Sequence, residues 1–163
     1  MVNIPKKYLN EKPVETLRAA IENQGKWIYF LTVEGLENGL SSEFAQKAMY
    51  ELGETYTHHE FRGCNTMQLL GTKLMNRAME KGMEAEADIH DEQLDLKIGY
   101  CPMLNMWGQL TADPERKKTL CAINCEMYRG LAEALGYSFE RTASIASGCD
   151  HCMLTFKKTS KEG

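Results

Sequence analysis

The chain has 163 residues, of which 43% are hydrophobic and 26% charged, so it fits one soluble domain and is neither disordered nor membrane-embedded. A net charge of -4 and isolated lysine pairs argue against nucleic-acid binding, because phosphate neutralisation requires a clustered basic surface. No apolar run approaches the roughly 18 residues of a membrane span or forms a secretory signal, so we expect a cytoplasmic protein whose six cysteines stay as thiols or metal ligands.

The N-terminal part carries helical signals after an irregular start. Residues 1–12 are expected to form an arm, and Pro13 suits the first turn of a helix over residues 14–23 that ends at Gly25. The dense apolar cluster at residues 27–33 is compatible with a strand or a helix. We prefer a helix there, because no hairpin signal follows it.

Two clearer helices follow. A serine cap precedes apolar residues at helical spacing over residues 44–52, and this helix is expected to end at Gly53. Residues 57–64 form a polar, titratable connector that contains two adjacent histidines. Met and Leu residues at helical spacing then predict a long amphipathic helix over residues 66–83.

The pattern changes to a period of two at residue 84. Residues 84–90 and 94–100 alternate polar and apolar side chains, and the three residues between them are short enough for a hairpin turn. Cys101 lies where the second strand ends, since Pro102 forces a break in the strand.

The C-terminal part predicts two helices and two strands. A short helix is expected over residues 103–110, and an aspartate–proline start at Asp113 opens a helix that runs to Leu135. Strands are expected over residues 139–146 and 152–157. The tail from residue 158 to 163 is expected to fray.

Helices come first and strands are concentrated late, and no linker or internal repeat divides the chain. The sequence therefore predicts a single domain over residues 1–163 of the α+β class. Its helical N-terminal half would pack on one face of a late antiparallel sheet.

Five of the six cysteines lie in the second half of the chain, which is the sharpest chemical signal in the sequence. Cys121 and Cys125 share one stripe of a predicted helix, and Cys149 and Cys152 flank the last predicted turn. With Cys101 at a strand end, these five can form a tertiary metal site, either zinc or an iron–sulfur cluster. Buried cysteines that act only as small apolar side chains are the alternative, for Cys125 and for Cys64 in particular.

A nucleophilic thiol is the second chemical interpretation, since it requires only one activated cysteine and a base. Cys101 is our candidate nucleophile, because a side chain at a strand end can face a pocket. His59 and His90 are the preferred candidate bases, with His58 and His151 as further candidates.

Several segments resemble the L-2-amino-thiazoline-4-carboxylic acid hydrolase family. They are Ile98-Gly99-Tyr100-Cys101-Pro102, Leu120-Cys121, Ala143-Ser144-Ile145-Ala146-Ser147-Gly148 and Cys152-Met153-Leu154-Thr155-Phe156-Lys157. The match falls on Cys101, Cys121 and Cys152, whereas Cys64, Cys125 and Cys149 lie outside the family pattern.

The resemblance implies a hydrolase that opens a cyclic amidine–thioether to give N-carbamoyl-cysteine. Either the Cys101 thiolate attacks the carbon between nitrogen and sulfur, or a cysteine-held metal supplies hydroxide. Arg62, Arg129 or Arg141 would bind the substrate carboxylate, with Arg62 and Arg141 preferred. The alternative is a small-molecule or metal-cofactor sensor without turnover. Under both hypotheses the expected partner is a small-molecule substrate or ligand, and the chain can form a homo-oligomer.

Overall fold

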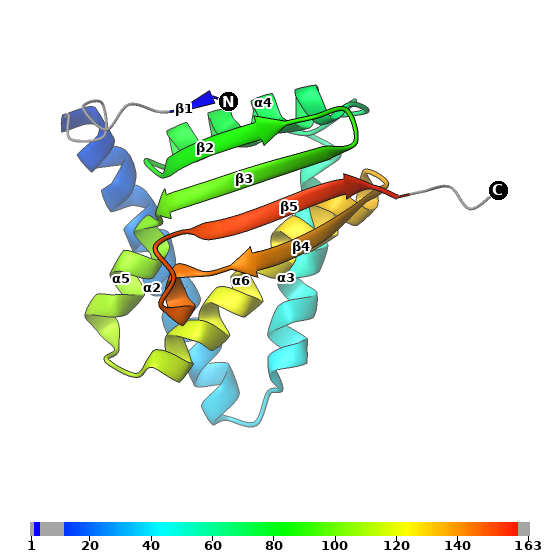
Figure 1. The fold of residues 1–163 in the computed structure, drawn as a ribbon. Helices are drawn as coiled ribbons and strands as arrows, with labels where there is room; N and C mark the ends of the chain where they lie inside the picture. The colour runs from blue at the N-terminus through cyan, green and yellow to red at the C-terminus, as the bar shows by residue number, and fades with distance from the viewer. Residues whose placement is uncertain (1, 4–11, 160–163) are drawn as a thin grey trace.

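The chain folds into two layers, with the helices packed behind a twisted antiparallel sheet (Figure 1). The structure, a computed structural model, describes residues 2–3 and 12–159. The predicted α+β class, with helices on one face of the sheet, is confirmed. In chain order the elements are β1 (Val2–Asn3), α2 (Lys12–Glu37), α3 (Ser42–Tyr56), α4 (Met67–Glu80), β2 (Glu84–Ile89), β3 (Gln93–Tyr100), α5 (Pro102–Leu110), α6 (Pro114–Ala134), β4 (Tyr137–Ala143), the 3₁₀ turn η1 (Ile145–Ser147) and β5 (Cys152–Lys158).

The sheet has the strand order β1-β2-β3-β5-β4, and every neighbouring pair is antiparallel. The predicted hairpin is the β2–β3 pair, in which Ala87 lies opposite Leu96. Strand β5 then inserts between β3 and β4, so that Leu96 also lies opposite Leu154. Alternation of buried and half-buried residues along these strands turns one apolar face toward the helices.

The main core lies between this sheet face and helices α3, α4 and α6. Its aromatic centre is formed by Tyr128, Phe139 and Phe156, with ring centroids 5.3–6.4 Å apart. Cys64 belongs to this core as well, at 4% exposure. The surroundings of Cys64 therefore fit the interpretation that it acts only as a small apolar side chain and not as a metal ligand.

A second, smaller core lies between α2, α5 and the first turns of α6. It contains Tyr29, Trp107 and Leu120, together with Cys121. The indole nitrogen of Trp107 donates a hydrogen bond to the carbonyl of Gly25 (2.9 Å), which pins α5 against the middle of α2.

Helices α2 and α3 continue through the glycines at which the sequence predicted their ends. Gly25 lies inside α2, where a Cβ would meet the Met103 backbone of α5 at 3.4 Å, an ordinary van der Waals distance. Gly53 lies inside α3, and here α6 crosses so closely at Met127 and Leu131 that a Cβ would overlap its backbone. The two predicted helix ends were thus wrong, because Gly53 admits a neighbouring helix and Gly25 is an interior position of a helix that packs against α5.

The predicted helix at residues 27–33 is confirmed as part of α2. The strand predicted at 139–146 is β4, which begins two residues earlier, at Tyr137, and ends three residues earlier, because the chain leaves the sheet after Ala143 and forms η1. At the N-terminus, Val2 and Asn3 pair with β2 instead of belonging to an irregular arm. Lys12 already belongs to α2, and Lys158 is the last residue of β5 rather than part of a frayed tail. Residues 4–11 and 160–163 lie outside the described residues, so the arm and the tail are not tested there.

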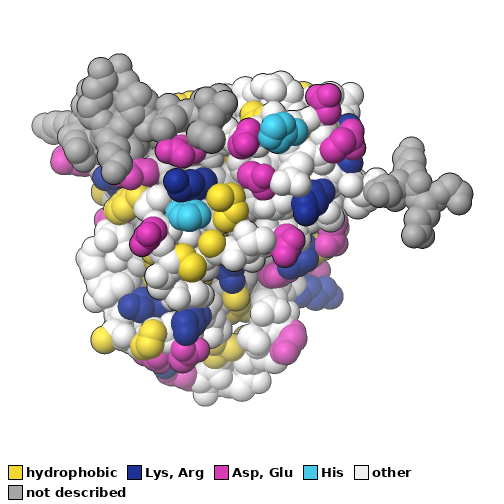
Figure 2. Space-filling model, viewed as in Figure 1, with side chains coloured by type: hydrophobic (Ala, Val, Ile, Leu, Met, Phe, Trp, Pro, Cys, Tyr) yellow, Lys and Arg dark blue, Asp and Glu magenta, His cyan; other side chains and the backbone are white. Residues whose placement is uncertain are grey.

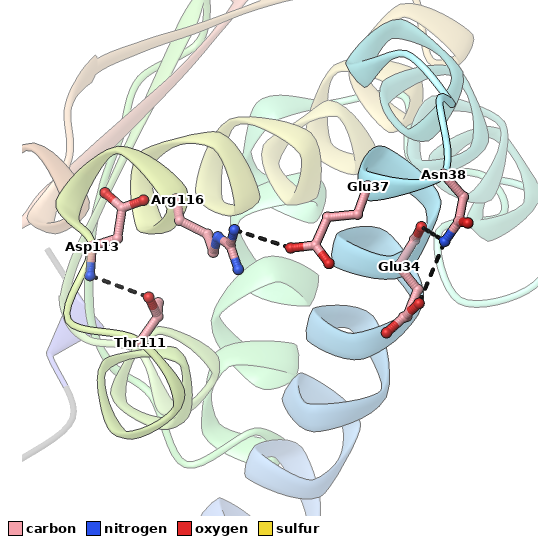
Figure 3. A network of polar contacts seen from close by, with 6 residues as sticks. All are labelled: Glu34, Glu37, Asn38, Thr111, Asp113 and Arg116. Atoms are coloured by element: carbon pink, nitrogen blue, oxygen red, sulfur yellow. Dashed lines mark hydrogen bonds and ion pairs between the residues drawn. The ribbon is translucent and has the colours of Figure 1, made fainter.

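The C-terminal end of α2 is tied to the start of α6 by polar contacts (Figure 3). The guanidinium of Arg116 contacts the carboxylate of Glu37 at 3.2 Å, and Asn38 donates to the carbonyl of Glu34. Asp113 caps α6 by accepting from the backbone N–H of Glu115. None of the helices in the described part of the chain is long and apolar enough to cross a membrane.

Candidate functional site

Four side chains from α6, β4 and the η1 turn meet at one edge of the sheet. Cys121 and Cys125 lie one turn apart on α6 and therefore face the same neighbour. That neighbour is β4, which places Arg141 opposite both thiols, and Ser144 follows where the chain leaves the sheet. We call Cys121, Cys125, Arg141 and Ser144 the thiol cluster.

The contacts within the thiol cluster are polar and specific. One guanidinium nitrogen of Arg141, Nη1, donates to the Cys121 sulfur at 3.1 Å and to the Cys125 sulfur at 3.3 Å. The hydroxyl of Ser144, which is 5% exposed, lies 3.7 Å from the Cys121 sulfur. Cys121 therefore has a cation and a hydroxyl within hydrogen-bonding distance while being itself almost buried.

These contacts favour an ionised thiol on Cys121. A hydrogen bond from Cys125 is the largest influence that lowers the pKa of Cys121, and hydrogen bonds from Ser144 and Arg141 and the arginine charge act in the same direction. They outweigh desolvation and bring the pKa to about 6. Cys125 changes in the opposite direction, since its hydrogen bond to Cys121 and its burial hold its pKa well above the usual value. The pair thus shares one proton, which stays on Cys125.

A hollow of about 330 Å³ opens beside the thiol cluster, between α6 and β4. Because β4 is the last strand of the sheet order, this hollow lies at an edge of the sheet. Cys125 and Arg141 form part of its wall, whereas Cys121, which contacts Arg141, is not among the lining residues. The lining residues are Ala122, Cys125, Glu126, Arg129, Phe139, Glu140 and Arg141.

Cys101, the candidate nucleophile of the sequence, lies at the end of β3 as predicted, in the N-cap position of α5. It packs against both cores, and burial raises the pKa of its thiol to about 11. The strongest other influences on this pKa are the backbone N–H groups of Leu104 and Met103 and nearby thiols, and none of them is an imidazole. Cys101 is thus held as a neutral thiol at neutral pH.

The two preferred candidate bases, His90 and His59, are exposed in turns. His90 is in the β2–β3 turn, exposed and 3.4 Å from Asp88. The eight residues of β3 separate this turn from Cys101 by about 25 Å at the rise of an extended strand. His90 is therefore unable to act on Cys101. His59 is exposed in the turn that follows α3, and Arg62 is exposed three residues later.

Of the two preferred substrate-binding arginines, Arg141 lines the hollow and Arg62 does not. Arg129, the further candidate, also lines it, and it is paired with Glu126 at 3.0 Å.

The predicted five-cysteine metal centre is not formed. Within residues 2–3 and 12–159, no three His, Cys, Asp or Glu side chains are grouped closely enough to hold a metal ion. All six cysteines are free. Cys149 is exposed in the turn before β5, whereas Cys152 is buried and accepts a hydrogen bond from the Ile145 N–H at 3.3 Å. The last turn therefore points the two thiols of the Cys-x-x-Cys segment into different environments.

The opposite face of the sheet carries charged side chains of both signs (Figure 2). A hollow of about 340 Å³ there is lined by Glu86, Asp88, Asp95 and Lys97 among others. Its charges are largely paired within the protein, since Lys97 lies 3.7 Å from Glu86 and the Thr155 hydroxyl donates to Asp95 at 2.6 Å. This hollow holds neither a thiol nor an activated base, so the thiol cluster is the stronger candidate site.

Sequence reasoning grouped Cys121 with Cys125 but missed the roles of their neighbours. The helical spacing of the two cysteines signalled a shared face, and Arg141 was named only for substrate binding. Ser144 was not considered as a contact of Cys121, because only the pairing of β4 with β5 and the turn after Ala143 bring it there.

The two-layer fold defines a class, the α+β domains that resemble subunits of the trafficking protein particle complex. One solved structure of this class is subunit 3 of that complex from Naegleria fowleri, covalently bound to palmitic acid. The similarity has a TM-score of 0.63 at 12% identity and covers 85% of this chain and 95% of that one. At this identity it shows the fold alone.

The family model described as L-2-amino-thiazoline-4-carboxylic acid hydrolase matches residues 6–156. The chain belongs to this family, as the resemblance of its C-terminal segments predicted. No curated protein matches the chain.

Proposed function

We propose that this protein is a hydrolase that opens a small cyclic amidine–thioether of the 2-amino-thiazoline-4-carboxylate type, with Cys121 as its nucleophile. Family membership supports the substrate class. The observation that carries the assignment of the nucleophile is the contact of one guanidinium nitrogen of Arg141 with both sulfurs of α6. A thiolate is the reactive form of cysteine, and this contact stabilises a thiolate.

Substrate binding in the hollow would use the charges of its wall. A 2-amino-thiazoline carboxylate carries an anionic group, and Arg141 is a wall residue that offers a charged donor to it. When the substrate carboxylate takes the guanidinium of Arg141, Cys121 loses part of its ion pair and becomes a stronger nucleophile. In this proposal Arg141 stabilises the Cys121 thiolate before the substrate binds and pairs with the substrate carboxylate afterwards.

The first step forms a bond between the Cys121 sulfur and the ring carbon that lies between nitrogen and sulfur. The bond between this carbon and the ring sulfur then breaks, and the departing sulfur takes the proton of Cys125. Cys125 is suited to this role because its raised pKa keeps the proton in place until a stronger base forms beside it. The product of this step is an S-linked isothiourea on Cys121 and a thiolate on Cys125.

The second step consumes one water molecule. Its oxygen bonds to the isothiourea carbon, one of its protons returns to Cys125, and the other goes to the nitrogen that belonged to the ring. The carbon–sulfur bond to Cys121 breaks, which restores the thiolate and releases N-carbamoyl-cysteine. Atoms balance with one water per ring opened, and no oxidant or reductant is required.

The test is turnover of 2-amino-thiazoline-4-carboxylate, followed by mass spectrometric detection of N-carbamoyl-cysteine. Cys121→Ala should lower the rate by at least about 1,000-fold, as expected for loss of a nucleophile. Cys149→Ala is the matched control, because this thiol is exposed and lies in the turn before β5, and it should keep the wild-type rate. Cys101→Ala should also retain turnover.

A second readout separates covalent catalysis from simple binding. Acid quenching of the wild-type reaction should trap protein whose mass is increased by one intact substrate molecule, with the added mass on the peptide that contains Cys121. Turnover that persists in Cys121→Ala would refute the nucleophile. Absence of product with the wild-type protein would refute the substrate class.

A further inference from the structure

An apolar patch covers the outer side of helices α2 and α3, away from the thiol cluster. Five large apolar side chains remain exposed there, at 47–71% of their surface. They are Trp27, Phe30, Leu31, Leu40 and Phe44, and we call them the apolar patch. Trp27 lies one helical turn before Leu31, and Leu40 and Phe44 follow in the α2–α3 turn and the first turn of α3.

The patch includes a groove as well as protruding side chains. A hollow of about 220 Å³ runs between α2 and α3, with Leu31, Leu36, Leu40 and Phe44 in its wall. The lining is predominantly apolar, and the volume is below the roughly 300–1,000 Å³ of typical small-molecule sites. The groove therefore suits an apolar side chain better than a separate ligand.

We propose that the apolar patch is the interface of a twofold-symmetric homodimer, in which aromatic side chains of each copy enter the α2–α3 groove of the other. An isologous interface requires one surface that carries both a projection and its complementary recess. Trp27 projects one helical turn before Leu31, which lines the groove, and Phe30 projects one turn after Trp27 on the outer side of α2. The patch thus contains both halves of a self-complementary contact.

The exposed area matches what a stable dimer requires. With about 200 Å² for an aromatic side chain and about 150 Å² for a leucine, the five residues leave roughly 550 Å² of apolar surface exposed. A standard interface buries about 800 Å² per partner, of which about 60% is apolar, or roughly 500 Å². Isolated exposed apolar residues need no explanation, but a contiguous patch of this size on a monomer does.

Charge around the patch disfavours a lipid surface as the occupant. Glu34, Glu37 and Glu43 are exposed on the same two helices, as are the cations Lys26 and Lys47. Carboxylates therefore outnumber cations beside the patch. Anionic headgroups attract basic residues and repel carboxylates. A second copy of the chain has no such conflict, because apolar side chains fill the centre of its interface and the acidic residues stay at the rim.

The two tryptophans of the chain provide a direct assay. Trp107 is buried at 1% exposure, whereas Trp27 is 66% exposed. A change of tryptophan emission with protein concentration therefore reports the environment of Trp27. We expect a blue shift and reduced acrylamide quenching on going from nanomolar to high micromolar concentration, together with a doubling of mass in sedimentation velocity.

Phe30→Glu should abolish both changes while leaving Trp27 in place, because each dimer would bury two carboxylates in its apolar contact. Since every residue of an isologous interface occurs twice in the dimer, we expect the dimer dissociation constant to rise at least about 100-fold. Met79→Glu is the matched control: this residue is 43% exposed on α4, outside the patch, and should leave dimerisation unchanged. Circular dichroism verifies that both variants fold.

A wild-type protein that stays monomeric at high micromolar concentration would overturn the proposal. So would a dimer that Phe30→Glu and Met79→Glu affect equally, because its interface would then lie elsewhere.

Discussion

Replacing Arg141 by methionine tests the electrostatic origin of the reactive thiol. Methionine keeps the length and apolar stem of arginine but removes the charge and the donor at 3.1 Å from the Cys121 sulfur. A hydrogen bond to a charged group contributes about 1.5–3 kcal/mol, and one pKa unit corresponds to about 1.4 kcal/mol. The pKa of Cys121 should therefore rise from about 6 by about one to two units.

The assay is the pH dependence of alkylation by iodoacetamide, followed on the Cys121 peptide by mass spectrometry. Only the thiolate reacts, so the rate follows the ionised fraction. At pH 7 about nine-tenths of the Cys121 thiol is ionised in the wild type, and Arg141→Met should lower the alkylation rate by about 2- to 10-fold. At pH 9 the two proteins should differ much less.

Arg129→Met is the matched control for this variant. Arg129 lines the same hollow but pairs with Glu126 and lies over the Phe139 ring rather than at a sulfur. Its removal should leave the Cys121 profile in place. A Cys121 pKa that is unchanged in Arg141→Met, or that rises equally in both variants, would refute the ion-pair reasoning.

Three further predictions follow from packing and proton sharing. Cys125→Ala should also raise the pKa of Cys121, because the substitution removes the hydrogen bond that lowers this pKa most. The pH profile of Cys121 alkylation measures the change, and an unchanged profile would contradict the shared proton. Folding lowers the pKa of Cys121, so the Cys121 thiolate stabilises the folded protein fully above the pKa of the unfolded thiol, near 9, and this stabilisation is lost as pH falls toward about 6. The free energy of unfolding, measured with urea, should therefore fall less over this pH range in Cys121→Ala than in the wild type. Gly130→Ala should destabilise the fold by about 3 kcal/mol or more, since its Cβ would overlap the α3 backbone. Gly108→Ala, whose Cβ meets open space, should instead stabilise α5 by about 0.5–1 kcal/mol. Equal unfolding midpoints for the two variants would contradict the close crossing of α3 and α6.

Periodicity predicted most of the elements because their signals are local. The β2–β3 hairpin follows from alternation, and the start of α6 follows from the Asp113 cap and Pro114. Gly25 and Gly53 were misinterpreted as helix ends because a glycine that stops a helix and a glycine that admits a neighbouring helix look alike in sequence. At Gly53 only the partner helix α6 distinguishes the two cases.

The site was less predictable, because its polar partners come from three separate segments. The spacing of Cys121 and Cys125 identified a shared face, but which residue lies opposite depends on the register of β4 against β5 and on the packing of α6 beneath them. Cys101 was the predicted nucleophile because its thiol lies at a strand end, directly before Pro102. Its actual surroundings raise the pKa of its thiol, and no local pattern encodes that burial.

The two proposals concern different sides of α6 and can therefore be tested independently. Ala122, Cys125 and Arg129 turn toward the hollow beside β4, whereas Ile123 turns toward the groove between α2 and α3. Successive residues of a helix point about 100° apart, so occupation of the groove by a second copy leaves the hollow open. Phe30→Glu should accordingly give a monomer whose Cys121 alkylates with the wild-type pH profile. A shifted profile in that monomer would show that the dimer contact and the thiolate are coupled through α6.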